Sequence, residues 1–278
     1  MATKRTTLRA VVIPEPVAQA QDGNQDMSRK LDVMNRLLSE QIHLQRVALL
    51  EAGHILRFNA PGANRVALSL PDAQDDFVQR VILKTRDFYE ARFLIQLRAL
   101  GIVTPSSVVC DVGANIGNHT VYFGRVLQAA KVLAFEPQVH CHETLSTNIA
   151  LNGLEDRAVA YNCMIGAVTG SGQMERFNAR NLGGTSFVPA EAGKVPMFAL
   201  DDMIETQDLA RLDLIKIDVE GMQMQVLAGA SGILEQRRPA LWIELLAKDH
   251  CYDEAVDYLA PLGYQPTRLG INDVLFRA

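Results

Sequence analysis

The segment around residues 108–118 constrains the fold of this chain most strongly. Val108-Val-Cys-Asp-Val112 is an apolar strand that runs directly into the turn Gly113-Ala-Asn-Ile-Gly117, and a helical pattern begins near Asn118. Glycine lets the backbone approach a ligand closely, and the free N–H groups at a helix start favour an anion. This pattern is typical of the ligand cradle of α/β folds, although a glycine turn alone can also be purely structural.

The chain that follows alternates short β-rich runs with helical patterns, which indicates a parallel α/β sheet. The last two strands are joined only by Leu269–Asp273, which is too short for a crossover, so we expect them to pair antiparallel. The predicted strands are Val108–Val112, Lys131–Phe135, Ala158–Met164, Leu214–Ile217, Leu241–Leu245, Tyr264–Arg268 and Val274–Arg277, with helices near 119–128, 140–151 and 222–235 and an insertion over 165–211.

The first 86 residues have a different character. Residues 1–26 are polar and show no sustained periodicity, so we expect a mobile tail there. Residues 27–86 are expected to form an N-terminal helix and a small β extension ahead of a domain that spans 87–278. The helix carries an apolar stripe, which packs either on the domain or on a partner such as a second copy in a homodimer. Its members are Leu31, Met34, Leu38, Ile42 and Leu49.

The link between this helix and the domain contains two strand patterns, His54–Phe58 and Val66–Leu70, around a Pro-Gly turn. Residues 73–84 and 88–100 then read as helices, with Asp87 as the expected N-cap of the second one.

Composition excludes several classes of protein. A net charge of −5 over 278 residues does not indicate a generally basic surface, which argues against a protein that binds nucleic acid mainly through its phosphates. Apolar runs are shorter than a membrane span needs, and the N-terminus lacks the apolar core of a signal peptide, so we expect a cytoplasmic protein. The cysteines form no C-x-x-C pair and are predicted to be reduced, buried thiols rather than disulfides or zinc ligands. They are Cys110, Cys141, Cys163 and Cys251.

Besides the glycine turn, Glu136 is a candidate ligand-binding residue. It follows the strand Lys131–Phe135 and lies 23 positions beyond Gly113. This is close to the offset of an acid that holds ribose hydroxyls. In a dinucleotide fingerprint, however, Asn115 and Asn118 would occupy glycine positions and crowd a pyrophosphate. A smaller ligand such as S-adenosylmethionine, with a ribose and a carboxylate but no pyrophosphate, fits the pattern better.

Three blocks of the sequence resemble a known family. VVCDVGANIGNHTVYFGRV, KVLAFEPQVHCHETLSTNIALNGL and LDLIKIDVEGMQMQVLAGA closely resemble the FkbM family of S-adenosylmethionine-dependent methyltransferases, over about residues 87–278. The resemblance implies a class I Rossmann-like α/β fold, with a seven-stranded, mostly parallel sheet whose last strand is antiparallel. The cofactor-binding candidates are Asp111, Gly113, Ala114, Asn115, Gly117, Asn118 and Glu136, and Tyr89 or Glu90 is expected to close over the cofactor.

Carboxylates also follow the strand Leu214–Ile217. Asp218 and Glu220 should lie on the same rim as the glycine turn, where they either act on a methyl acceptor or cap the next helix. Glu244 ends the next strand on that rim, and His250 is either an alternative base or an ordinary surface histidine. The spacing of these four catalytic candidates matches no dedicated metal motif, so we expect no tightly held metal.

These observations predict a methyltransferase that acts on a small-molecule or glycan acceptor, by O-methylation of a hydroxyl on a sugar, glycan or secondary metabolite. The alternative is a non-catalytic S-adenosylmethionine-binding or scaffold protein. A nicotinamide oxidoreductase is disfavoured by Asn115 and Asn118. The glycine-containing insertion Phe177–Phe187 is either an acceptor-binding lid or a solvated loop.

Overall fold

The structure is a computed structural model of the chain. It describes residues 30–49 apart from 32, 35, 39, 42, 43 and 46, and residues 52–207, 209, 211–245 and 251–278. Two compact units are present, Met1–Leu44 and Gln45–Ala278. The described residues of the first unit are helical and include Leu31, Met34 and Leu38 of the predicted apolar stripe. The expected mobile tail at 1–26 and the stripe residue Ile42 lie outside the described residues.

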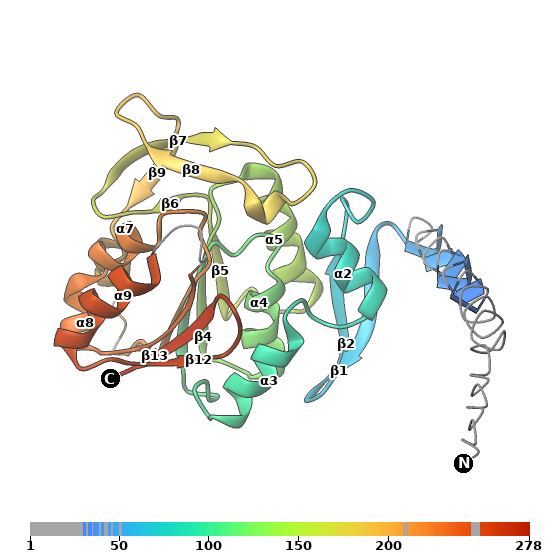
Figure 1. The fold of residues 1–278 in the computed structure, drawn as a ribbon, viewed down its shortest axis with the longest axis horizontal. Coiled ribbons are helices and arrows are strands. Elements are labelled where there is room, and N and C mark those ends of the chain that lie inside the picture. Colours follow the sequence, from blue (N-terminus) through green and yellow to red (C-terminus); the bar gives the residue numbers. More distant parts are fainter. Residues whose placement is uncertain are drawn as a thin grey trace, which may run out of the picture. The chain divides into compact units, whose positions relative to one another are not determined.

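A seven-stranded sheet forms the centre of the second unit, in the order β12-β13-β11-β10-β3-β4-β5 (Figure 1). All neighbouring strands from β11 to β5 are parallel, whereas β13 pairs antiparallel with both β11 and β12. The predicted sheet and its antiparallel last strand are therefore confirmed. The strands are β3 (Val108–Val112), β4 (Lys131–Phe135), β5 (Ala158–Tyr161), β10 (Leu214–Ile217), β11 (Ala240–Glu244), β12 (Gln265–Arg268) and β13 (Asp273–Arg277).

Helices cover both faces of this sheet because alternate strand residues point to opposite sides. Val109 belongs to the apolar core on the side of α3, α4 and α5, and Cys110 belongs to the core on the side of α7, α8 and α9. The helical segments are α3 (Ala91–Ala99), α4 (Asn118–Val121), its continuation η1 (Tyr122–Val126), α5 (Val139–Leu151), α7 (Gln223–Ala228), α8 (Ser231–Gln236), α9 (Cys251–Leu259) and η4 (Ala260–Leu262). No described helix is long and apolar enough to cross a membrane.

The helix predicted at 222–235 is broken into α7 and α8. Gly229 ends the first of them, and a side chain at this position would overlap the backbone carbonyl of Gly166. The backbone of Gly229 lies against the start of the insertion at the point where α7 ends, so the predicted continuous helix was wrong.

The N-terminal part of the second unit holds the predicted hairpin. β1 (Ile55–Ala60) pairs antiparallel with β2 (Ala63–Ser69). The helix predicted at 73–84 is α2 (Phe77–Thr85), which begins later because Asp76 caps it by accepting the N–H of Gln79 at 2.8 Å.

The helix predicted at 88–100 begins at Ala91 instead, and Asp87 does not cap it. The N-cap position is taken by Glu90, whose φ of 58° lies in the left-handed region. The side-chain amide of Asn118 accepts the N–H of Tyr89 at 2.9 Å and donates to its carbonyl at 3.1 Å. These two bonds hold residue 89 against the start of α4 and keep it out of a helix.

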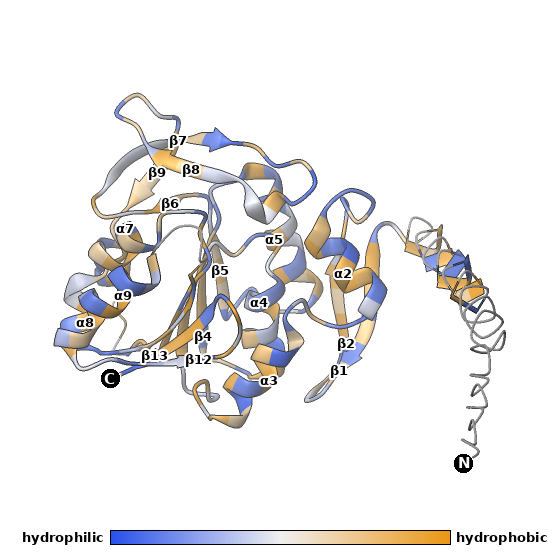
Figure 2. Cartoon of the chain, viewed as in Figure 1, coloured by the Kyte–Doolittle hydropathy of each residue, from blue (hydrophilic) through white to orange (hydrophobic). Residues whose placement is uncertain are grey.

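The insertion folds into a second sheet, in the order β6-β9-β7-β8, which the sequence did not reveal. This small sheet lies above the carboxyl ends of the central strands (Figure 1). Its inner strand β7, which pairs with both β9 and β8, ends in hydrophilic residues, whereas the central strands of the large sheet are hydrophobic (Figure 2). The elements are β6 (Met164–Ile165), β7 (Gly170–Arg176), η2 (Leu182–Gly184), β8 (Ser186–Pro189), β9 (Val195–Phe198) and α6 (Leu200–Glu205).

Candidate active site

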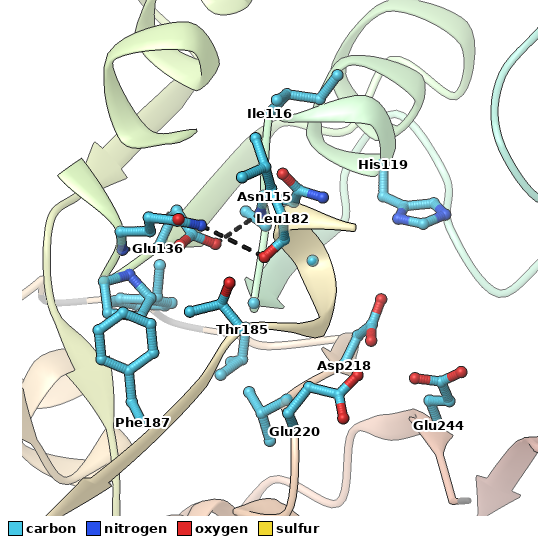
Figure 3. Close-up of a pocket in the computed structure, with 18 of the residues that line it drawn as sticks. Asn115, Ile116, His119, Glu136, Leu182, Thr185, Phe187, Asp218, Glu220 and Glu244 are labelled. Carbon is cyan, nitrogen blue, oxygen red and sulfur yellow. Dashed lines mark hydrogen bonds between the residues drawn. The ribbon is translucent and has the colours of Figure 1, made fainter. Parts of the chain in front are cut away.

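A cavity of about 1120 Å³, including its open mouth, lies between the carboxyl ends of the central strands and the insertion. We call it the main cavity. Glu136 lies on one side of it, and Asp218, Glu220 and Glu244 lie on the other (Figure 3). The structure thus brings nine of the predicted site residues to one place. They are Tyr89, Gly113, Ala114, Asn115, Asn118, Glu136, Asp218, Glu220 and Glu244.

Three predicted site residues are not in this group. Asp111 and Gly117 are not among the residues that line the main cavity. His250 lies outside the described residues. Asp111 is fully buried below the turn, where one carboxylate oxygen accepts the hydroxyl of Thr120 at 2.6 Å. Its other oxygen is 3.5 Å from Nζ of Lys216, so Asp111 joins β3 to β10.

The glycines of the turn serve the packing of the protein itself. Gly113 has a φ of 79°, and a side chain there would overlap the backbone carbonyl oxygen of Asp218. Gly117 has a φ of 83°, and a side chain there would overlap Leu145 of α5. The left-handed backbone and these close approaches together require glycine at both positions. The turn is therefore held in shape before any ligand arrives.

Glu136 has a fixed orientation at the end of β4. One carboxylate oxygen accepts the N–H of Asn115 at 2.8 Å (Figure 3). The other accepts the N–H of Gln138, also at 2.8 Å. Only 6% of the residue is exposed. Burial raises the pKa of Glu136 to about 7, against the opposing effect of the two backbone hydrogen bonds. Each oxygen retains a lone pair that a ligand hydroxyl can meet.

Asp218 and Glu244 differ in charge. Nζ of Lys216 donates to Asp218 at 3.0 Å. Burial opposes the charge of Asp218, but the charge of Lys216 together with the hydrogen bonds from Glu244 and Lys216 lowers the pKa of Asp218 below its usual value. Burial and the neighbouring charge of Asp218 raise the pKa of Glu244 to about 9. At neutral pH the pair is therefore an ionised Asp218 hydrogen-bonded to a protonated Glu244.

Lys216 was not among the site residues predicted from the sequence. It is 2% exposed, and burial alone would lower its pKa, but the carboxylates of Asp218, Asp111 and Glu90 raise the pKa above its usual value. A lysine in the middle of the apolar strand Leu-Ile-Lys-Ile is the signal that could have revealed it, because buried charges are almost always paired.

Glu90 and His119 form the remaining polar wall near Asp218. Burial, followed by the charge of Asp218, raises the pKa of Glu90 to about 7. Burial lowers the pKa of His119 to about 3, so this ring is neutral. Nε2 of His119 is 3.3 Å from the Glu90 carboxylate but makes no hydrogen bond to it. The ring packs edge-on against Trp242, with 5.0 Å between the ring centroids, which indicates a structural role for His119.

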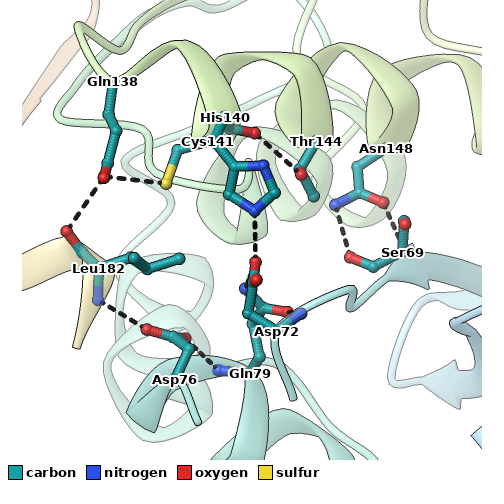
Figure 4. Close-up of polar contacts among 10 residues, drawn as sticks. All are labelled: Ser69, Asp72, Asp76, Gln79, Gln138, His140, Cys141, Thr144, Asn148 and Leu182. Carbon is teal, nitrogen blue, oxygen red and sulfur yellow. Dashed lines mark hydrogen bonds and ion pairs between the residues drawn. The ribbon is translucent and has the colours of Figure 1, made fainter. Parts of the chain in front are cut away.

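The roof of the main cavity is the segment around η2. The N–H of Leu182 donates to Asp76 at 2.7 Å, and its carbonyl accepts from Nε2 of Gln138 at 3.3 Å (Figure 4). Asn181 and Thr185 of the predicted lid line the cavity. This part of the insertion is therefore packed over the site rather than solvated.

Glu220 lies at the edge of the main cavity, where its carboxylate is 3.9 Å from the guanidinium of Arg176 on β7. Within the described part of the chain, no group of three or more His, Cys, Asp or Glu side chains could hold a metal ion.

Comparisons with known proteins agree with this geometry. The chain is 32% identical over 155 residues to methyltransferase sdnD of Sordaria araneosa, which covers 44% of this chain and 59% of that protein. It is 28% identical over 159 residues to the hexuronic acid methyltransferase AglP of Haloferax volcanii, which covers 55% of this chain and 62% of that protein. The chain thus spans about three fifths of the length of these relatives.

A solved structure of an FkbM methyltransferase from Methylobacillus flagellatus has a similar fold, with a TM-score of 0.51 and 17% identity. The similarity covers 74% of this chain and 57% of that one. The family model described as "Methyltransferase FkbM domain" matches residues 111–266, which is more than half of the chain. Since this match includes the turn, Glu136, Asp218 and Glu244, the chain belongs to the FkbM methyltransferase family.

Proposed function

We propose that this chain is an S-adenosylmethionine-dependent methyltransferase that transfers a methyl group to a hydroxyl on a sugar, glycan or secondary metabolite. One observation carries the proposal: a rigid Glu136 carboxylate and an ionised Asp218 face each other across one cavity whose floor is the glycine turn. Membership of the FkbM family supports the reaction. The name of the Haloferax relative supports a sugar-related acceptor.

The residues of the main cavity suit this cofactor. Glu136 is placed to hold the two ribose hydroxyls, because both of its oxygens are already oriented by backbone N–H groups. Oδ1 of Asn115 is buried and has no hydrogen-bond partner among the described residues. A buried amide oxygen without a partner suits the amino group at the other end of the cofactor. When bound, S-adenosylmethionine supplies an electrophilic methyl carbon on a positively charged sulfur.

The protein's own contribution to the reaction is mainly alignment, because methyl transfer is an in-line displacement. Asp218 accepts a hydrogen bond from the acceptor hydroxyl, orients its oxygen and takes its proton as the new bond forms. Lys216 keeps Asp218 ionised, and the proton on Glu244 is shared with Asp218. Asp218 is therefore the proposed catalytic group, and Glu244 and Lys216 are positioning residues.

Titration calorimetry with S-adenosylhomocysteine tests the first half of the proposal. We expect binding by the wild type and about one to two decades weaker binding by Glu136→Gln, because the carboxyl group that accepts from both ribose hydroxyls is lost. A matched control is Glu143→Gln on the solvent side of α5. No binding by the wild type, or equal binding by the Glu136 variant, would overturn the assignment.

Transfer of labelled methyl groups to a panel of hydroxyl acceptors tests the second half. Cofactor binding without transfer to any acceptor would favour the non-catalytic alternative. His250 remains a candidate base, and the His250→Gln variant belongs in the same assay.

The remaining expectations from the sequence stay proposals. They are a domain boundary near residue 86, a homodimer formed through the N-terminal helix, and a cytoplasmic location. The last of these is supported by the four cysteines, all of which are buried thiols. Light scattering of the full chain, compared with a Leu31→Ser, Leu38→Ser variant, tests the homodimer.

A further inference from the structure

A second cavity adjoins the main one, and we call it the side cavity. Its walls come from α2, from the segment that leads into α3, from the end of β11 and from the turn between β12 and β13. Tyr89, Glu90 and Glu244 line both cavities. The two cavities therefore meet at these three residues, next to Asp218. Asp218 lines the main cavity only, so a group that reaches it from the side cavity must pass these three residues.

The far wall of the side cavity is built into the fold. A side chain at Gly270, in the turn between β12 and β13, would overlap the ring of Phe93. The backbone carbonyl of Asn272 accepts the N–H of Leu245 at 2.8 Å. The carboxylate of Asp273 accepts Nε1 of Trp242 at 2.9 Å. These contacts fix the turn on α3 and on β11, so the cavity has a defined shape without a ligand.

The charges on its walls are unequal. Four acids, Asp87, Glu90, Glu244 and Asp273, line the side cavity, and Arg92 is the only cationic residue among its lining. Burial is the main reason why the pKa is raised to about 7 for Glu90, to about 9 for Glu244 and to about 6 for Asp273. Near neutral pH such carboxyl groups offer O–H donors as well as acceptor oxygens.

This lining distinguishes between classes of ligand. Hydroxyl groups can both donate to and accept from carboxyl groups, and Thr85 and Asn272 add uncharged polar atoms on the same walls. An anionic group, by contrast, would lose part of its hydration on entering the side cavity. It would lie beside several acids, and Arg92 is the one cationic side chain among the lining residues that could compensate. Repulsion from the acids that are ionised at neutral pH therefore opposes the binding of an anion.

Given the methyltransferase function proposed above, on which this inference rests, we propose that the side cavity binds the methyl acceptor and that this acceptor is an uncharged polyhydroxylated compound. The acceptor hydroxyl passes between Glu90 and Glu244 to reach Asp218, and the rest of the molecule stays in the side cavity. The acids of the side cavity exclude a compound that presents a carboxylate to them.

The test uses the wild-type chain saturated with S-adenosylhomocysteine. The probes are the methyl glycosides of glucose, galactose and mannose at millimolar concentration, each paired with its uronate. Saturation-transfer NMR measures binding of each probe. We expect at least one neutral glycoside to bind, and its uronate to bind at least about tenfold more weakly at pH 7.

Variants locate the binding. Thr85→Trp fills the side cavity from the last turn of α2, and Lys84→Trp is its matched control on an exposed neighbour that does not line the cavity. We expect the first to weaken glycoside binding about tenfold or more and the second to leave it unchanged. Ile271→Trp, on the opposite wall, repeats the test if the first variant fails to fold. Affinity for S-adenosylhomocysteine should stay at the wild-type value in all three.

The proposal is overturned if a uronate binds as tightly as its neutral partner, if both blocking variants keep wild-type binding, or if no neutral glycoside binds while S-adenosylhomocysteine does. Absence of S-adenosylhomocysteine binding by the wild type would instead overturn the proposed methyltransferase function, so the two failures are distinguishable.

Discussion

Lys216→Met is the most informative single change, because it removes a charge from a buried site and largely preserves the volume of the side chain. In the structure, Nζ of Lys216 lies 3.0 Å from a carboxylate oxygen of Asp218 and 3.5 Å from one of Asp111. Without the lysine, the fully buried carboxylate of Asp111 and the partly exposed carboxylate of Asp218 have no cation between them. Removing one partner of a buried ion pair typically costs about 3–5 kcal/mol. Since domains are stable by only about 5–15 kcal/mol, this loss should be large.

The loss should also depend on pH. Lys216 lowers the folded-state pKa of Asp218, so in the wild type this pair adds stability above the unfolded-state pKa and loses it as the pH falls. In the variant, burial raises the same pKa above its unfolded value, so stability is now lost as the pH rises. The difference in unfolding free energy between wild type and variant should therefore be larger at pH 8 than at pH 5.

Urea unfolding followed by circular dichroism at these two pH values measures the effect. The matched control is Lys131→Met, since Lys131 is also on a central strand but, among the described residues, donates only to the neutral side chain of Gln207, at 3.3 Å. We expect this control to lose less than about 1 kcal/mol. Adding Asp218→Asn to Lys216→Met should restore part of the stability. Equal stability of Lys216→Met and wild type at both pH values would refute the argument.

Three further predictions follow from the site. Asp218→Asn should lower kcat by about two to four decades with little change in S-adenosylhomocysteine affinity; a near wild-type rate would show that Asp218 is only a helix cap. Glu136→Ala should keep the circular dichroism spectrum and weaken S-adenosylhomocysteine binding by about 1.5–3 kcal/mol, and unchanged affinity would contradict its role. Gly113→Ala should prevent stable folding, because its Cβ would overlap the carbonyl of Asp218, whereas Gly153→Ala, with a φ of +62° and open space around it, should cost only about 1–2 kcal/mol. Equal melting temperatures for these two variants would show that the overlap is relieved.

The middle of the central sheet could be predicted because β3, β4, β10 and β11 are short, mostly apolar runs buried on both faces. Val108–Val112 and Lys131–Phe135 have the predicted bounds, and the hairpin at the end of the chain follows from the shortness of Leu269–Asp273. The second sheet could not be predicted in the same way. Most of β7 is exposed, so its sequence carries no apolar alternation.

Within the site, the sequence located the glycine turn and the acids but not the interactions that hold them. Asn118 was expected to bind the cofactor, yet both polar atoms of its amide already bond to the backbone of Tyr89. The closest neighbour that Gly113 avoids is the carbonyl of Asp218, 105 positions later in the chain. Contacts between such distant residues leave no local pattern, which is why motif spacing alone could not assign these roles.

The double anchoring of Leu182 affects how much the site must be reorganised when a ligand enters. A surface loop that orders itself on binding spends part of its interaction energy on lost conformational freedom. Here Asp76, from the region before the family-matched residues 111–266, has already fixed that loop through its backbone. Removing the Asp76 carboxylate would therefore leave every proposed contact to the ribose in place and yet weaken binding, since part of the roof would have to be ordered anew at each binding event.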